Sequence, residues 1–244
     1  MGLYLEVRPE LLQAVKTLSE KHDLALYRKV LREQDRANMN SLLTEARFGI
    51  FFDLYAQALR HEVKAFKGSN KTPDWAIDVN GQIIIAEVYR LNPAEDLQRR
   101  REAVGVFHRI IPQPLKLSGE FGVLTKKAEK YGPLVEAAGY PLLICLYFDF
   151  VSGQDKLDLF NCLYGRSVEF GGPIAHPDFP LGTVYHNLES ALFYDQQQIR
   201  KNVSGVLLKT EDSFIYFDNY NPANRLNSAN RIWLKSFELD YNDF

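Results

Sequence analysis

The stretch PDWAIDVNGQIIIAEVYRL, residues 73–91, decides the fold of this chain. Apolar runs lie on both sides of Asn80-Gly81. Asn-Gly between two such runs predicts a β-hairpin, because both central residues of a type I′ turn need a positive φ. We therefore expect strands over residues 75–79 and 82–91, joined by a two-residue turn.

This hairpin places two carboxylates. Asp74 opens the first expected strand, and Glu87 lies late in the second. In an antiparallel pair, the beginning of one strand lies opposite the end of the next, so the two carboxylates can converge at one end of the sheet. Oxygen ligands of this kind suit a hard divalent cation, and such a cation suits phosphate chemistry.

Pro-Asp, a hairpin and then Glu-x-Lys form the signature of the PD-(D/E)XK nuclease superfamily, which the chain resembles over residues 41–150. Pro73, Asp74 and Glu87 match the signature, and their separation fits the family. The resemblance implies an α/β fold with a mixed central sheet flanked by helices, of the restriction-endonuclease-like type. It also implies metal-dependent phosphodiester hydrolysis of DNA, with Mg²⁺ or Mn²⁺ held by Asp74, Glu87 and the Val88 carbonyl.

Tyr89 stands where the family has its lysine. That lysine holds or helps to deprotonate the attacking water and stabilises charge on the phosphate, whereas a neutral phenol cannot supply positive charge. An active enzyme therefore needs a lysine from elsewhere. Lys127 lies at the edge of the apolar stripe of a helix expected over residues 118–138, and some superfamily members resemble this arrangement. The alternative is a solvated lysine face, which is the simpler interpretation of Lys126.

Glu45 is a further candidate. It heads an apolar stripe with Phe48, Phe52, Tyr55 and Leu59 on a helix that we expect to begin at residue 40 or 41 and to end near residue 61. A carboxylate at the head of such a stripe points toward the edge of the core, where it could bind a second ion or orient water. An equally good interpretation is a first-turn glutamate favoured by the helix dipole.

Composition sets broad limits. The 244 residues are 46% hydrophobic, enough for one large domain or a core with an extension, and the net charge of −2 means that any nucleic-acid-binding surface is local. Residues 99–101 are three arginines that could follow a phosphate backbone, although a solvated helix face explains them more simply.

Cys145 lies in an apolar run and is expected to be a buried thiol. The N-terminus lacks a signal-peptide pattern and no apolar run could span a bilayer, so we expect a cytoplasmic protein.

The remaining pattern suggests three parts. We expect an N-terminal helical segment over residues 1–40, the nuclease-like core over residues 41–150, and a C-terminal α+β extension over residues 151–244 that packs on the core. Further helices are expected over residues 9–21, 24–36, 93–110 and 228–237. Further strands are expected over residues 63–66, 142–150, 204–209 and 214–218, and residues 165–185 are rich in Gly and Pro and predict loop.

Two functions stay open at this point. One is a Mg²⁺-dependent deoxyribonuclease, with DNA as its partner. The other is a catalytically inactive protein of the same fold that acts as a nucleic-acid-binding or protein-interaction module. Tyr89 and the mild acidity favour the second, whereas the retained Asp74 and Glu87 favour the first, because an unused pair of convergent carboxylates costs stability. The sequence leaves the oligomeric state open, a homodimer included.

Overall fold

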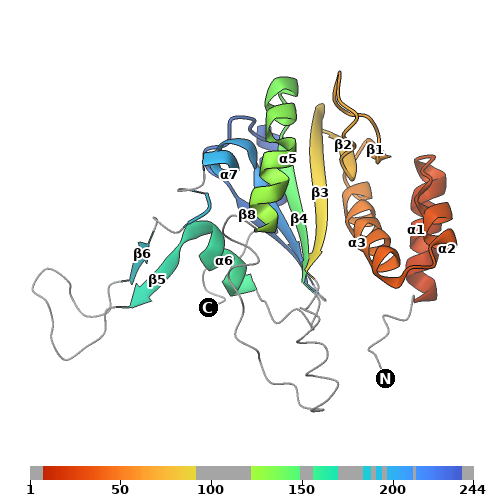
Figure 1. Ribbon diagram of the computed structural model, residues 1–244, viewed down its shortest axis with the longest axis horizontal. Helices are drawn as coiled ribbons and strands as arrows, with labels where there is room; N and C mark the ends of the chain where they lie inside the picture. Colours follow the sequence, from red (N-terminus) through yellow and green to blue (C-terminus); the bar gives the residue numbers. More distant parts are fainter. Residues whose placement is uncertain are drawn as a thin grey trace, which may run out of the picture.

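The computed structural model describes residues 8–91, 122–148, 156–169, 184–187, 191–193, 197–210 and 213–237. It has a six-stranded mixed sheet in the order β1-β2-β3-β4-β7-β8, with helices packed on its faces (Figure 1). A separate pair consists of β5 (Arg166–Glu169) and β6 (Val184–Asn187). The α/β class with a mixed central sheet and flanking helices is thus confirmed, whereas a specific restriction-endonuclease-like core stays a prediction.

The hairpin forms as expected. Its strands are β2 (Trp75–Val79) and β3 (Gln82–Leu91). Asn80 has a φ of 50° and Gly81 has a φ of 71°, the pair of positive values that a type I′ turn requires. The antiparallel register runs from the Val79–Gln82 pair at the turn to the Trp75–Ala86 pair, so Asp74 and Glu87 occupy the next position along the ladder.

The other strands build outward from the hairpin. β1 (Ala58–His61) pairs antiparallel with β2, and β4 (Leu142–Phe148) pairs parallel with β3. All seven residues of β4 are buried, which confirms the expected central strand. β7 (Gly205–Lys209) and β8 (Phe214–Asp218) complete the same sheet, so chain beyond residue 150 contributes directly to it.

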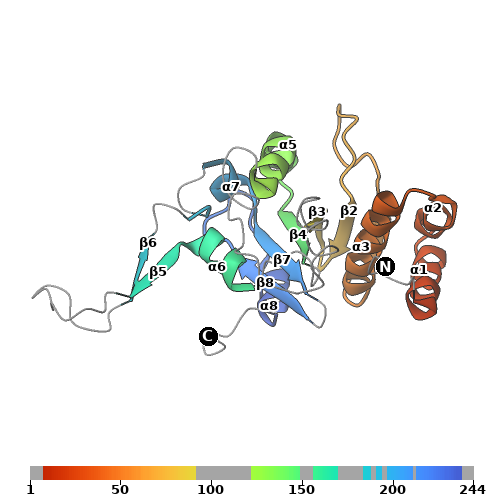
Figure 2. The same ribbon diagram turned by 60° about the horizontal axis from the view of Figure 1, so that its bottom comes forward.

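Two helical layers cover the sheet. On one face α3 (Arg36–Asp53) packs on the strands and separates them from α1 (Pro9–Lys21) and α2 (Leu26–Arg32), as Figure 2 shows. On the other face α5 (Val123–Ala138) packs over β3 and β4. The remaining helices are α6 (Lys156–Tyr164), α7 (Gln197–Asn202) and α8 (Ser228–Lys235).

The expected boundaries around α3 were wrong. The helix begins at Arg36, where the side chain of Asp35 accepts from the backbone N–H of Asn38 at 2.9 Å, and it ends at Asp53. Residues 58–61 form β1 instead of a last helical turn, and residues 63–66 are not a strand. Leu59 is only 2% exposed in β1, so pairing with β2 outweighs the local helical pattern that its spacing suggested.

Other expectations had mixed outcomes. α5 is followed by Gly139 at its C-cap, with the left-handed φ of 70° that is typical of this position. Residues 165–185 were expected to be loop, but they contain β5 and the beginning of β6, and α7 was not anticipated. The expected helix over residues 93–110, with its three arginines, lies outside the described residues. No helix in the described part of the chain combines the length and apolar character that a membrane crossing requires.

Candidate functional site

Asp74 and Glu87 lie together at the sheet end that the hairpin register predicted. The backbone N–H of Asp74 donates to Glu87 Oε1 at 3.2 Å, and the backbone N–H of Val88 donates to Asp74 Oδ2 at 2.7 Å. Each carboxylate is therefore held by a backbone amide beside the other. These bonds extend the β2–β3 ladder beyond its last pair and fix the orientation of both side chains.

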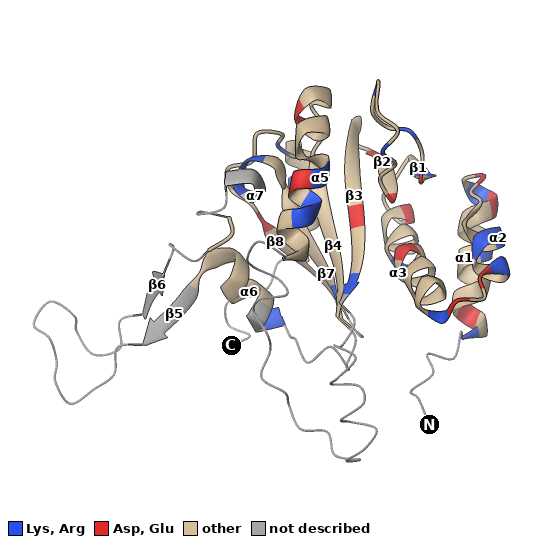
Figure 3. Cartoon of the chain, viewed as in Figure 1, with Lys and Arg blue, Asp and Glu red and all other residues tan. Residues whose placement is uncertain are grey.

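Glu87 is fully buried and paired with a cation. Its side chain is 0% exposed, and Lys127 Nζ lies 2.6 Å from its Oε2. Glu87 shares a sheet face with Ile85, which packs against α5, and Lys127 comes from that helix. Figure 3 shows acidic positions on β3 and basic positions on α5. An unpaired carboxylate at this depth is strongly disfavoured, so the ion pair with Lys127 offsets part of the cost of burying Glu87.

Tyr131 also belongs to this group, although it was not among the predicted site residues. It lies one helical turn after Lys127, is fully buried, and its hydroxyl donates to the Thr72 carbonyl at 2.8 Å. Burial and the adjacent Glu87 charge raise the pKa of Tyr131. The hydrogen bond from the Tyr131 hydroxyl to Thr72 connects α5 to the segment that leads into Asp74. Its i+4 spacing from Lys127 on the same apolar stripe was the available indication.

The site carries an excess of negative charge. Burial, followed by the charges of Glu87 and Glu45, raises the pKa of Asp74 to about 7, against the opposing effect of Lys127 and the Val88 amide. Burial alone lowers the pKa of Lys127, but the charges of Glu87 and Asp74 outweigh it and raise that pKa above its ordinary value. One lysine therefore does not balance the neighbouring carboxylates. A divalent cation fits such a donor set, because it would relieve the repulsion that now favours protonated Asp74.

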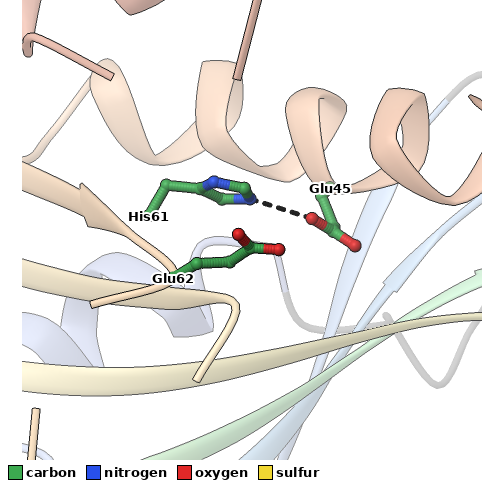
Figure 4. Close-up of side chains that lie close together, drawn as sticks. All are labelled: Glu45, His61 and Glu62. Atoms are coloured by element: carbon green, nitrogen blue, oxygen red, sulfur yellow. Dashed lines mark hydrogen bonds and ion pairs between the residues drawn. The ribbon is translucent and has the colours of Figure 1, made fainter. Parts of the chain in front are cut away.

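The Glu45 side chain forms its hydrogen bond with His61 and not with Asp74 or Glu87. Its Oε2 lies 2.8 Å from His61 Nε2, while its charge still acts on Asp74. Glu45, His61 and Glu62 form a group whose possible metal-ligating atoms all lie within 4.8 Å of one another (Figure 4). Neither His61 nor Glu62 was predicted, because residue 61 had been placed at a helix end. The His61-Glu62 pair at the end of β1 was the missed indication.

Tyr89 occupies the position of the family lysine, two residues beyond Glu87 on β3. Tyr89 is 39% exposed, and the ammonium group near Glu87 comes from Lys127 instead. Val88 uses its N–H to hold Asp74, and its side chain is buried on the α3 face of the sheet. The Val88 carbonyl as a metal ligand stays a prediction.

Cys145 lies in β4 close to these groups. It is free and fully buried, as expected. Burial, with the charges of Asp74 and Glu87, raises the pKa of its thiol well above the ordinary value. The thiol therefore stays protonated and serves as core packing.

The comparisons with known proteins give no relative. No family model matches the chain, and no curated protein or solved structure matches it. The geometry around Asp74, Glu87 and Lys127 therefore carries the functional inference.

Proposed function

We propose that this protein is a metal-dependent nuclease that hydrolyses phosphodiester bonds in DNA. The observation that carries the proposal is the Glu87–Lys127 ion pair of 2.6 Å beside Asp74. It supplies two carboxylates and one ammonium group, the same chemical groups as the PD-(D/E)XK signature, although the lysine comes from a helix. The resemblance at Pro73, Asp74 and Glu87 supports the same reading.

Asp74 and Glu87 are the residues that would hold Mg²⁺ or Mn²⁺, with the Val88 carbonyl as a further ligand. When bound, such a cation activates water and neutralises charge on the phosphate. The protein contributes preorganisation, since backbone amides fix both carboxylates before any ion binds. Glu45 adds negative charge near Asp74 and so strengthens the attraction for a cation.

Lys127 supplies the positive charge that Tyr89 cannot. Its raised pKa keeps the ammonium group charged at neutral pH, and its side chain is still 19% exposed. The group can therefore face a phosphate while it remains close to Glu87. A fixed cation next to the reacting phosphate stabilises the charge that develops in the transition state, and it needs no reorganisation when the reaction occurs.

The experiment is a cleavage assay with supercoiled plasmid and with single- and double-stranded oligonucleotides, in Mg²⁺, in Mn²⁺ and in EDTA. Metal-dependent cleavage by the wild type, lost in Asp74→Asn prepared in the same way, is the expected result. Equal cleavage by both preparations would mean that a contaminating nuclease is responsible.

The second candidate function is an inactive protein of this fold that binds nucleic acid or another protein. Tyr89 favours it, because a partly exposed aromatic ring replaces the catalytic cation at that position. Retention of labelled DNA without cleavage, under every metal condition, would support this candidate and contradict the nuclease.

A further inference from the structure

We propose that Glu45, His61 and Glu62 form a second divalent-metal site, which takes a transition-metal ion such as Zn²⁺. The three side chains bring one imidazole nitrogen and two carboxylates together, with their ligating atoms within 4.8 Å of one another (Figure 4). This site uses none of the side chains proposed to hold Mg²⁺. It stands whether or not the protein cleaves DNA.

The fold holds the backbone of this site in place. His61 ends β1 opposite Trp75, and the N–H of Glu62 donates to the Asp74 carbonyl at 3.1 Å. Trp75 also contacts α3, because its Nε1–H donates to the Glu45 carbonyl at 3.1 Å. Its ring lies 4.7 Å from the His61 ring, centroid to centroid. Ligands carried on such fixed elements bind an ion with little loss of entropy.

The donor chemistry favours zinc over magnesium. An imidazole nitrogen suits Zn²⁺, whereas Mg²⁺ prefers oxygen ligands and gives up its water reluctantly. The His61 side chain is 2% exposed, and its Nε2 already faces a Glu45 carboxylate oxygen at 2.8 Å. Two carboxylates balance the charge of one divalent ion. Three protein ligands leave the fourth tetrahedral position for water.

An opening leads from Glu45 to the surface. Glu45 contributes to the wall of an open cavity of about 440 Å³, whose other lining residues come from α2 and the segment that follows it and from α3: Lys29, Arg32, Glu33, Asn38, Ser41 and Leu42. The cavity gives an ion and its water a route to Glu45, one of the three proposed ligands.

Lys29 competes for the same site. It forms an ion pair with Glu62, and both side chains are 38% exposed. Lys29 therefore neutralises Glu62 in the metal-free protein, and an incoming ion displaces the ammonium group. Removal of the Lys29 charge should make metal binding tighter, an effect opposite in sign to the loss of a ligand.

The test is calorimetric titration of the full chain with Zn²⁺, together with Co²⁺ titration followed by visible absorption. Glu62→Gln and His61→Gln should weaken Zn²⁺ binding by about tenfold or more, the size of effect seen when groups that serve a metal centre are removed. Lys29→Met should tighten binding about two- to fivefold, in line with the energy of an exposed ion pair. Wild-type Co²⁺ spectra should show the intense bands of a four-coordinate site.

The matched control is His22→Gln. His22 Nε2 lies 2.5 Å from Asp53 Oδ1, so this site also pairs an imidazole with a carboxylate. The other group on Asp53 is the ammonium of Lys21 and not a second carboxylate. This variant should therefore bind Zn²⁺ like the wild type. Glu62 is exposed, which lets Glu62→Gln fold normally. Unchanged Zn²⁺ affinity in Glu62→Gln would overturn the proposal. So would Zn²⁺ binding that Asp74→Asn removes and the variants of His61 and Glu62 retain, since the ion would then belong to the Asp74–Glu87 pair.

Discussion

Lys127 Nζ lies 2.6 Å from Glu87 Oε2, although the two residues are 40 positions apart in the chain. Glu87 comes from the centre of the sheet and Lys127 from the helix that covers it. The ammonium group therefore reaches the buried carboxylate across the helix–sheet interface. In a Glu-x-Lys signature the cation would come from residue 89 of the same strand.

Lys127→Met should lower the turnover of DNA cleavage by roughly 10²-fold or more, the loss found when one group that stabilises transition-state charge is removed. Methionine keeps much of the aliphatic stem and removes only the charge. The metal-free variant should also be less stable, because Glu87 would be left buried without its cation. Single-turnover cleavage and urea unfolding measure the two effects.

The matched control is Lys126→Met. Lys126 is the adjacent residue of α5 and is exposed, so its replacement should leave turnover near the wild-type value. Equal turnover in Lys127→Met and the wild type would refute the role of Lys127, provided that Asp74→Asn is inactive in the same assay.

Tyr89→Lys should partly restore cleavage when it is combined with Lys127→Met. Residue 89 follows Glu87 by two positions, so its side chain projects from the same face of β3. Tyr89→Phe alone should cleave DNA like the wild type, because the phenol hydroxyl carries no charge to the phosphate. A double variant as inactive as Lys127→Met would show that a cation on the strand cannot replace one on the helix.

Glu87→Gln should abolish the rise in melting temperature that Mg²⁺ produces in the wild type. At an ion concentration of about ten times Kd, binding to the native state adds roughly 1.4 kcal/mol, or about 3–6 °C for a chain of this size. The amide can still accept from the Asp74 N–H. Scanning fluorimetry with and without Mg²⁺ measures the shift, with Glu62→Gln as the variant that should retain it. A full Mg²⁺ shift in Glu87→Gln would remove Glu87 from the ligand set.

The hairpin and its carboxylates could be read from the sequence because the information is local. Asn80-Gly81 fixes the turn, the turn fixes the register, and the register brings Asp74 next to Glu87. The position of Lys127 followed from the apolar stripe of its helix together with the family resemblance. Its contact with Glu87 is a finding of the structure.

The Glu45–His61–Glu62 group could not be read in this way. It depends on β1, a four-residue edge strand that is defined by pairing with β2 and not by its own sequence. The spacing of Phe48, Phe52 and Leu59 also fits a helix, so a local pattern alone assigned these residues to one long helix. Only the nonlocal pairing separates β1 from α3 and turns His61 toward Glu45.

Gly49→Ala should destabilise the protein by about 1–3 kcal/mol, the usual effect of overpacking a core. A Cβ at this position would lie 2.4 Å from Cζ2 of the Trp75 ring, which His61 and the Glu45 carbonyl hold in place. Ser41→Ala, at an exposed position of the same helix, should change stability little. Urea unfolding of both variants checks this, and a stability of Gly49→Ala equal to that of the wild type would show that Trp75 can move aside.

Metal-free protein should lose stability as the pH rises from about 4 to above 7, because of Asp74. Its pKa is about 7 in the folded protein, against 3.8 for an unperturbed aspartate, so the folded state binds the proton more tightly than the unfolded state. The stabilising contribution is therefore complete below about pH 3.8 and is lost as the pH passes through 7. Asp74→Asn cannot ionise, yet its amide oxygen can still accept from the Val88 N–H, so this part of the slope should disappear. Free energies of unfolding in EDTA at several pH values provide the measurement. The same slope in Asp74→Asn and the wild type would mean that another group titrates. Neighbouring groups would then already balance the charge of the Asp74 carboxylate without a metal ion.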